Sequence, residues 1–325
     1  MRKSTELLTK TVLILTLGLM AAGACAQTYP SRPIRLIINV DPGGGSDILA
    51  RRLSPGLSQN LSQNVVVENK PGAAGILGTS AAAAAAPDGY TLTMISSSHT
   101  SNAPLHKSLP YDPVNSFSPV ILYAMSPQVL LVQPDAPFKT IKDLIAYSKS
   151  NPEKLNMGSS GTGSTPHLSG ELLKMMSGIN FTHIPYKGGG PAMASLMAGQ
   201  LDLLFVVTQT AKPQVAAGKV RILGAASAQR LKAFPDVPTI AESGVTGYEA
   251  SNWAGVLAPA RTPAGIVQIL HDAVLKTTNS REISDWMEQQ GLEPVDIGPE
   301  EFRKVLQSEI TKWTRVVKAA NIPIE

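Results

Sequence analysis

The stretch INVDPGGGSDILARRL, Ile38 to Leu53, joins an apolar run to three consecutive glycines and then to a pattern typical of a helix. A strand that leads through a glycine loop into a helix leaves backbone N–H groups directed outward, at the positive end of the helix dipole. Ser46 or Asp47 is placed to cap that helix. The stretch therefore predicts an α/β fold with a loop that can bind an anion, and a tight turn without a ligand is the alternative.

The glycines match neither of two common nucleotide-binding patterns. A phosphate-binding P-loop requires a lysine directly after its last glycine, and no lysine follows here. A dinucleotide fingerprint requires a third glycine at the position that Ile48 occupies. Both nucleotide interpretations fail. The loop can still bind an anion through its backbone amides.

A second stretch, LNMGSSGTGSTPHLSGELLKMM, Leu155 to Met176, repeats this design with a short apolar strand, a Ser/Gly/Thr loop and a helix. Pro166 stands in the first turn of that helix, where proline is tolerated. Met175 and Met176 are interpreted as core-filling side chains. If the two loops face each other across a cleft, they can hold a carboxylate from both sides without a cationic side chain.

The N-terminus has the order of a secretory signal. Basic residues, including Arg2 and Lys3, precede the apolar run TVLILTLGLMAAG and the small-residue sequence Ala-Cys-Ala. The run is too short to span a bilayer, so residues 1–26 are predicted to be a cleaved signal peptide that directs the protein to the periplasm. Lipidation of Cys25 is the lesser alternative, because Ala22 stands where a bulky aliphatic residue is expected.

Cleavage would remove the one cysteine of the chain and lower the net charge from +4 to +2. Without a thiol, nucleophilic cysteine chemistry, cysteine-ligated zinc and iron–sulfur clusters are excluded. Lysine and arginine are scattered and aromatic residues make up 5% of the chain, so no nucleic-acid partner is expected. The histidines lack zinc-binding spacing, and neither a metal nor a cofactor is predicted.

Apolar runs rich in β-forming residues alternate with helix-length segments from Ile34 to Pro259. Because these runs are continuously apolar, they predict mainly parallel sheets covered on both faces by helices. The run SAAAAAA before Pro87 predicts a tightly packed helix, and the pair Pro55-Gly56 predicts an early kink or break in the helix after the first loop. The length of the chain favours two domains.

Several motifs stand together in a specific order: PSRPIRLIINVDPGGGSD, VVVENKPGAAGILGTSAAAAAAPDGYTL, GSSGTGSTPHLSGELL and FPDVPTIAESGVTGYE. In these motifs the chain resembles the substrate-binding proteins of tripartite tricarboxylate transporters, the Bug or TctC family of periplasmic receptors. The resemblance implies a two-lobed periplasmic-binding-protein fold of type II, the Venus flytrap. One lobe comprises residues 27–126 plus 252–325, and the other comprises residues 127–251.

The resemblance also implies a function. The protein would capture a small carboxylate, such as an organic acid, an aromatic acid or an amino acid, and deliver it as a monomer to membrane subunits like TctA and TctB. Carried over to this chain, the ligand contacts fall on glycine, serine and neighbouring residues: Gly43, Gly44, Gly45, Ser46 and Asp47 in one lobe, Ser160, Gly161, Gly163, Ser164 and His167 in the other, and Ser97 and Ser98 at the same cleft.

Two departures from the family pattern bear on the ligand. Asp41 lies beside the first loop and would repel an anion, so a ligand with a cationic group is favoured if this carboxylate faces the cleft. Val206 and Val207 follow Phe205 where polar residues are frequent in the family.

Two other functions fit parts of the sequence. A periplasmic hydrolase is disfavoured, because the sequence around Ser164 lacks the closing glycine of a nucleophile elbow. A ligand-loaded sensor partner of a membrane kinase cannot be separated from a transport receptor by sequence. The protein is therefore predicted to be a binding protein and not an enzyme.

Overall fold

The computed structural model describes residues 29–43 and 45–324, and the strands and helices named below all lie in one compact unit that begins at Arg32. The predicted signal peptide, residues 1–26, lies outside the described residues. Within the described part of the chain, no helix combines the length and the apolar character needed to cross a bilayer.

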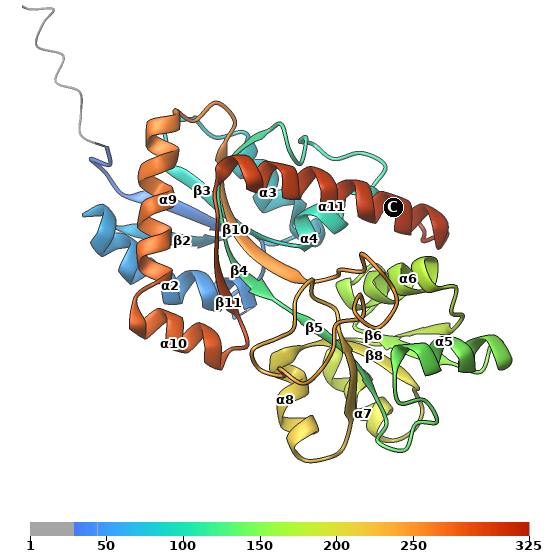
Figure 1. Cartoon of the computed structure of the whole chain (residues 1–325). Helices are drawn as coiled ribbons and strands as arrows, with labels where there is room; N and C mark the ends of the chain where they lie inside the picture. Colours follow the sequence, from blue (N-terminus) through green and yellow to red (C-terminus); the bar gives the residue numbers. More distant parts are fainter. Residues whose placement is uncertain (1–28, 44, 325) are drawn as a thin grey trace, which may run out of the picture. The chain divides into compact units, whose positions relative to one another are not determined.

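Two sheets form the framework of the molecule (Figure 1). The first sheet has the strand order β11-β4-β10-β3-β1-β2. Its strands, in chain order, are β1 (Ile34–Ile38), β2 (Val65–Asn69), β3 (Thr91–Ser96), β4 (Phe117–Ser126), β10 (Asn252–Pro259) and β11 (Glu293–Ile297). The second sheet has the order β7-β6-β8-β5-β9. Its strands are β5 (Gln128–Val132), β6 (Asn156–Ser159), β7 (Thr182–Pro185), β8 (Leu203–Val207) and β9 (Arg221–Ala225).

Helices follow most strands. Those associated with the first sheet are α2 (Gly45–Leu61), α3 (Ile76–Ala83), α4 (Ser98–Ser101), α9 (Ala264–Thr278), α10 (Arg281–Gln289) and α11 (Pro299–Ala319), with short 3-10 turns at Ala73–Gly75 and Ala103–Leu105. Those in the second half of the framework are α5 (Ile141–Ser150), α6 (Thr165–Ser177), α7 (Gly189–Met197) and α8 (Thr208–Ala216). The predicted α/β architecture of two helix-flanked sheets is confirmed.

Both sheets are mixed rather than mainly parallel. In the first sheet, β1 pairs parallel with β2 and β3, whereas β10 runs antiparallel to β3 and β4. In the second, β6 pairs parallel with β7 and β8, whereas β5 runs antiparallel to β8 and β9. The antiparallel pairs arise where the chain passes between sheets, since β4 and β5 are separated only by Pro127 and belong to different sheets. Continuous apolar character indicated burial of these strands correctly, but it does not encode their direction.

Helix α2 runs through Pro55-Gly56 without a break, so the predicted break is wrong and the predicted kink stays a prediction. Pro55 lies inside the helix and is exposed, so the hydrogen bond that it cannot donate faces solvent. Gly56 lets α2 approach α9 closely, because a Cβ atom at this position would lie 2.7 Å from Cγ2 of Thr277. Asn60 then donates to Thr277 Oγ1 at 2.9 Å. Tertiary packing against α9 therefore supports a helix that the local sequence disfavours.

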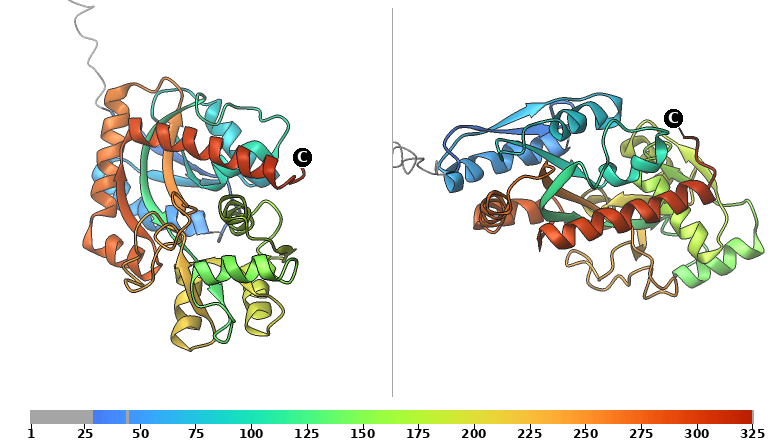
Figure 2. Two further views of the ribbon diagram at one scale, coloured as in Figure 1. Left: turned by 45° about the vertical axis from the view of Figure 1, so that its right-hand side comes forward. Right: turned by 90° about the horizontal axis from the view of Figure 1, so that it is seen from above.

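The long helix α11 belongs to both cores. Its first turns bury Phe302 and Leu306 with residues of the first sheet, whereas Trp313 and Val316 are buried with residues of the second. Figure 2 shows α11 running along the molecule toward α6. The lobe boundaries at residues 126 and 252 stay a prediction, since this helix joins the two halves.

Three further features bear on the sequence predictions. The alanine run does form part of a packed helix, α3, in which Ala82 is buried. Strand β11 was not predicted, because it is short and only partly buried. Met175 and Met176 do not fill the core: they remain 44% and 38% exposed, because α6 already buries Leu168 and Leu172 on its inner face.

Candidate functional site

The first glycine loop connects β1 to α2 and is braced by Asp47. The Asp47 carboxylate is 3% exposed and accepts hydrogen bonds from Gly43 N–H, Arg51 Nε and Asn69 Nδ2, each at 2.9 Å. The backbone hydrogen bond from Gly43, followed by those from Arg51 and Asn69, lowers the pKa of Asp47 to about 2. The buried carboxylate is thus ionised, and the hydrogen bond that it accepts from Gly43 holds the loop in its conformation.

The second loop connects β6 to α6 and is braced by His167. Gly163 N–H donates to His167 Nδ1 at 3.0 Å, and Ser164 Oγ donates to the carbonyl oxygen of Gly161 at 2.6 Å. The His167 ring stacks on His183 with 3.7 Å between centroids. Gly161 and Gly163 have φ values of 135° and 76°, which only glycine adopts readily.

Both imidazoles of this pair are neutral at pH 7. Burial lowers the pKa of His167 and of His183 to about 4, and the neighbouring His183 ring contributes to the shift at His167. A neutral ring leaves Nδ1 of His167 free to accept the Gly163 N–H. His183 Nε2 lies 2.7 Å from Ser159 Oγ, which in turn accepts from Gly161 N–H.

The two loops therefore share one construction. In each, a glycine N–H donates to a side chain four residues further on, in the first turn of the following helix: Gly43 to Asp47, and Gly163 to His167. These two N–H groups are engaged internally. The helices begin at Gly45 and Thr165, so the N–H groups of their first turns have no partner within the helix and are available to an anion.

Two adjacent cavities of about 460 and 420 Å³ lie at these helix ends. The first is lined by Gly45, Ser46, Ile48, Leu49, Ser96, Ser97, Ser98, Ser126, Thr165, Gln209, Asn252, Trp253, Ala254, Trp286, Gln290 and Leu292. The second is lined by Ser98, Ser101, Asn102, Gln128, Ser160, Gly163, Ser164, Thr165, Pro166, Gly189, Leu204, Phe205, Val206, Val207, Thr210 and Asn252. Because Ser98, Thr165 and Asn252 line both, the cavities adjoin each other.

The predicted contact residues divide into three groups. Gly45, Ser46 and Ser97 line the first cavity, Ser160, Gly163 and Ser164 line the second, and Ser98 lines both. Gly43, Asp47, Gly161 and His167 line neither cavity and instead hold the loops in shape. Gly44 lies outside the described residues.

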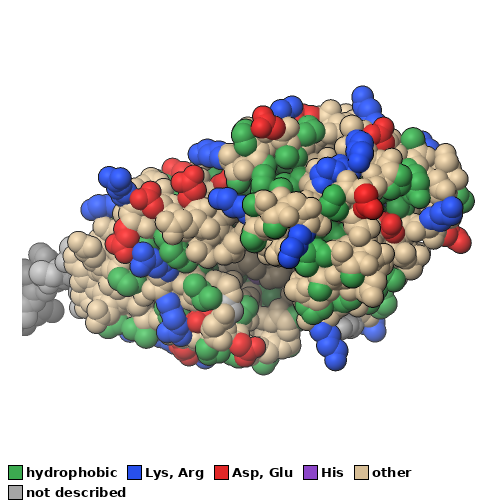
Figure 3. Space-filling model, turned by 90° about the horizontal axis from the view of Figure 1, so that it is seen from below, with side chains coloured by type: hydrophobic (Ala, Val, Ile, Leu, Met, Phe, Trp, Pro, Cys, Tyr) green, Lys and Arg blue, Asp and Glu red, His purple; other side chains and the backbone are tan. Residues whose placement is uncertain are grey.

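No aspartate, glutamate, lysine, arginine or histidine lines either cavity in the described part of the chain. Asp41, which the sequence placed beside the loop, is exposed and is absent from both linings. On the face shown in Figure 3, acidic and basic side chains are dispersed rather than gathered in one patch. The described lining therefore offers a ligand neutral hydrogen-bonding groups, helix dipoles and apolar contacts.

The sequence did not indicate several polar lining residues. Asn252 begins β10 and its Oδ1 accepts from Ser97 Oγ at 2.8 Å. Gln128 begins β5 and donates to Ser169 and to the carbonyl of Ala250, while its buried Oε1 has no partner among the described residues. The signal that both share is a polar residue at the start of an apolar strand that begins where the chain passes from one sheet to the other.

The described residues of the two loops and cavities do not assemble a catalytic or metal site. Ser164 donates to a carbonyl rather than to His167, and Ser159, which does lie beside a histidine, is fully buried and lines neither cavity. Within the described residues no group of three or more potential metal-binding side chains comes together. A larger groove of about 660 Å³, between α6 and α11, contains no residue of either loop.

Comparison with known proteins identifies the family. The model of the tripartite tricarboxylate transporter family receptor, TctC, matches residues 49–322. This chain belongs to that family. The family consists of solute-binding receptors, so the protein is a binding protein and not an enzyme.

Solved structures of family receptors resemble the chain closely. The periplasmic binding protein BugD is 33% identical, with a TM-score of 0.70 and coverage of 91% of this chain and 99% of BugD. Rpa4515 of R. palustris, solved with adipate, is 35% identical, with a TM-score of 0.73 and coverage of 91% and 99%. MatC of Rhodopseudomonas palustris, solved with malate, is 31% identical, with a TM-score of 0.70 and coverage of 89% and 100%.

Proposed function

We propose that this TctC-family receptor binds a small carboxylate at the two adjoining cavities, with the carboxyl group held between the N-termini of α2 and α6. The observation that carries the proposal is the convergence of both helix starts, through Gly45 and Thr165, on cavities whose linings contain no charged side chain among the described residues. An anion there gains hydrogen bonds from unpaired N–H groups and a favourable dipole at each helix.

The polar lining supports the same ligand class. Ser98 and Thr165 carry hydroxyl groups that can donate to carboxylate oxygens, whereas the hydroxyls of Ser97 and Ser164 already donate to Asn252 Oδ1 and to the Gly161 carbonyl. Two relatives with a similar overall fold, Rpa4515 and MatC, were solved with the carboxylates adipate and malate. The binding residues of this chain are proposed to be Gly45, Ser46, Ser97, Ser98, Ser160, Gly163 and Ser164, with Thr165 and Asn252 added from the cavity linings.

Thermal melting against a panel of carboxylates tests this function, with the neutral amide of each acid as its matched control. A ligand present at about 100 times its dissociation constant stabilises the native state by about 2.7 kcal/mol, which raises the melting temperature by several degrees. We expect acids to produce this shift and their amides to produce little. Equal stabilisation by acids and amides would refute carboxylate recognition.

We infer further that the protein is exported with cleavage after Ala26 and serves as a monomer that delivers its ligand to TctA/TctB-like membrane subunits. Family membership and the order of basic, apolar and small residues at the N-terminus support this inference. Mass spectrometry of protein from its native host should give Gln27 as the first residue. Light scattering should give a monomer mass, and the liganded protein should co-purify with transporter subunits; capture of a membrane kinase instead would favour the sensor alternative.

A further inference from the structure

One part of the first cavity is apolar. Ile48 and Leu49 come from the first turn of α2, and Trp286 and Leu292 come from α10 and the segment after it. We call these four residues the apolar wall. The serines of the same cavity come from the ends of β3 and β4, so apolar and polar groups enter it from different elements.

Packing against the rest of the described chain leaves much of the Ile48 side chain uncovered. It is 51% exposed, although the neighbouring Leu49 is 6% exposed and belongs to the core. When a ligand covers a large aliphatic side chain that is exposed beside a cavity, the burial of apolar surface stabilises the complex. Ile48 is therefore suited to contact an apolar part of the ligand.

Trp286 is held in place by an arginine of α2. Arg52 pairs with Glu282 at 2.9 Å, and its guanidinium carbon lies 5.8 Å from the centroid of the Trp286 ring. Ile48 and Arg52 are one turn apart on α2, and Glu282 and Trp286 are one turn apart on α10, so each pair shares a helix face. Arg52 thus connects the two faces that carry the wall.

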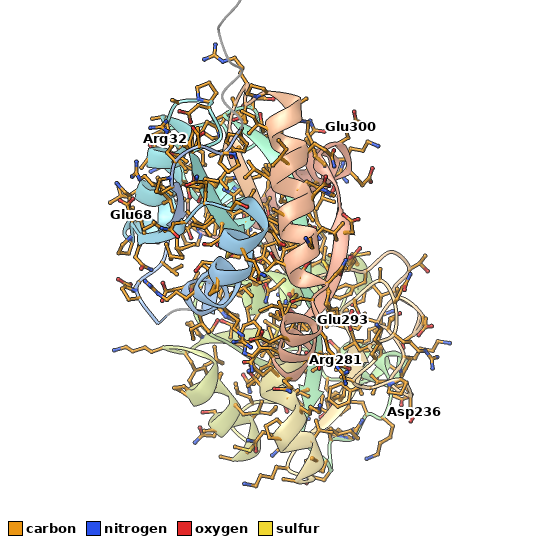
Figure 4. All side chains as sticks on the ribbon, turned by 90° about the vertical axis from the view of Figure 1, so that its left-hand side faces the viewer. Arg32, Glu68, Asp236, Arg281, Glu293 and Glu300 are labelled. Atoms are coloured by element: carbon orange, nitrogen blue, oxygen red, sulfur yellow. The ribbon has the colours of Figure 1, made fainter. Side chains whose placement is uncertain are left out.

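Contacts beyond the C-terminal end of α10 also fix its position. The helix starts at Arg281, which Figure 4 shows on the same side of the molecule as Glu293, at the start of β11. Beyond the helix, Gln290 accepts a hydrogen bond from Gln209 of α8 at 2.8 Å, and Thr208 donates to the carbonyl of Gly291. These bonds join α10 to the second sheet's half of the framework next to the cavity.

The absence of a cation from the described lining bears on the far end of the ligand. One carboxylate can be held at the helix N-termini, but a second carboxylate at the far end would lie among the apolar wall and the neutral amides of Gln209 and Gln290, without a charged partner. Burial of an unpaired charge is strongly unfavourable. An apolar tail at that end, in contrast, would cover Ile48 and stack on the Trp286 ring.

We propose that the apolar wall selects monocarboxylates with an aromatic or extended aliphatic tail over dicarboxylates of equal length, with Trp286 as the specificity-determining residue. This inference rests on the proposed carboxylate function. Arg52 and Glu282 are positioning residues, since they act through the orientation of Trp286.

Titration calorimetry with matched acids tests the selection. Hexanoate and adipate have the same number of carbon atoms and differ in whether the far end is a methyl or a carboxylate group; phenylacetate adds an aromatic tail. We expect hexanoate and phenylacetate to bind at least tenfold more tightly than adipate. Trp286→Ala should weaken phenylacetate binding at least tenfold and adipate binding less than threefold, whereas Trp286→Phe should retain phenylacetate affinity within threefold.

A matched pair of isoleucine variants controls for nonspecific effects. Ile269 of α9 is 41% exposed and lines neither cavity, so Ile269→Ala should leave all affinities unchanged, whereas Ile48→Ala should weaken hexanoate selectively. Adipate binding as tight as hexanoate binding, or equal weakening of all acids by Trp286→Ala, overturns the role of the wall. Binding of hexanamide as tight as that of hexanoate overturns carboxylate recognition itself, which separates the two failures.

Fluorescence quenching gives a second readout. Trp253 and Trp313 are 3% and 0% exposed, so acrylamide quenching of the folded protein reports mainly on the partly exposed Trp286. Saturating phenylacetate should reduce this quenching, whereas adipate at saturation should reduce it much less. Equal protection by both acids contradicts contact between the tail and Trp286.

Discussion

His183→Gln is expected to make the stability of the protein less sensitive to mild acid. In the native state the stacked His167 and His183 rings are neutral, and burial lowers the pKa of each to about 4. In the unfolded chain both would titrate near 6.5. Between pH 6.5 and pH 4 the unfolded state therefore binds more protons, so the free energy of unfolding falls as the pH decreases.

The size of the effect follows from the two pKa values. Lowering the pH from 7 to 5 costs about 2 kcal/mol for a fully buried imidazole with this shift, and about 1 to 2 kcal/mol for the half-buried His183. The His183→Gln substitution would remove this contribution and would also relieve the repulsion that the His183 ring exerts on a protonated His167. Glu171 Oε1 lies 3.8 Å from His167 Nε2, and this contact is common to both proteins, so it does not account for a difference between them.

Urea unfolding of both proteins at pH 7 and pH 5 measures the effect. The loss of unfolding free energy on acidification should be about 1 to 2 kcal/mol smaller in His183→Gln than in the natural protein. The buried His99, whose pKa is also lowered to about 4, contributes equally in both proteins. His106→Gln, outside the pair, serves as control and should behave like the natural protein. Equal losses in His183→Gln and the natural protein would refute the assignment of a neutral pair.

Three further outcomes are expected. Gly45→Val should reduce ligand affinity more than tenfold with little change in melting temperature, because a Cβ at Gly45 meets no atom within 4 Å but occupies the cavity. Gly265→Val, at an equally open helix start away from the site, should leave the affinity unchanged. Unchanged affinity in Gly45→Val would contradict the anion site. Affinity measured by calorimetry should be constant from about pH 6 to pH 9, since no titratable side chain of the described residues lines either cavity; a tenfold change in this range would reveal a charged contact. Asp47→Asn should weaken binding about tenfold, because an NH2 group replaces one of the two carboxylate oxygens that accept from Gly43, Arg51 and Asn69. In the natural protein these bonds should fail only as the pH falls from about 4 toward the lowered pKa of about 2. Retained affinity in the variant would show that the loop holds its shape with one acceptor oxygen fewer.

The amino-acid sequence determined the local features of the site. A glycine loop between an apolar strand and a helix requires only neighbouring residues, so the two stretches around Gly43 and Gly163 revealed both loops. The braces from Asp47 and His167 span four residues, and the sequence pointed to both side chains. The sequence did not reveal that Asp47 and His167 accept hydrogen bonds from their own loops rather than contact a ligand. Either role places the same residue type at the same position, so the sequence does not distinguish them.

Tertiary structure decided the features that depend on contacts between distant segments. The direction of β4, β5 and β10 follows from the passage of the chain between the sheets, which apolar content does not specify. Helix α2 continues through Pro55 because α9 packs against Gly56.

The cavities themselves show the same division. Ser98, Thr165 and Asn252 come from separate parts of the chain and line both cavities, although no local pattern connects them. Trp286 enters the wall through a pairing of α2 with α10. Short-range hydrogen bonding and helix dipoles are encoded in neighbouring residues, whereas cavity walls form only when burial brings distant surfaces together.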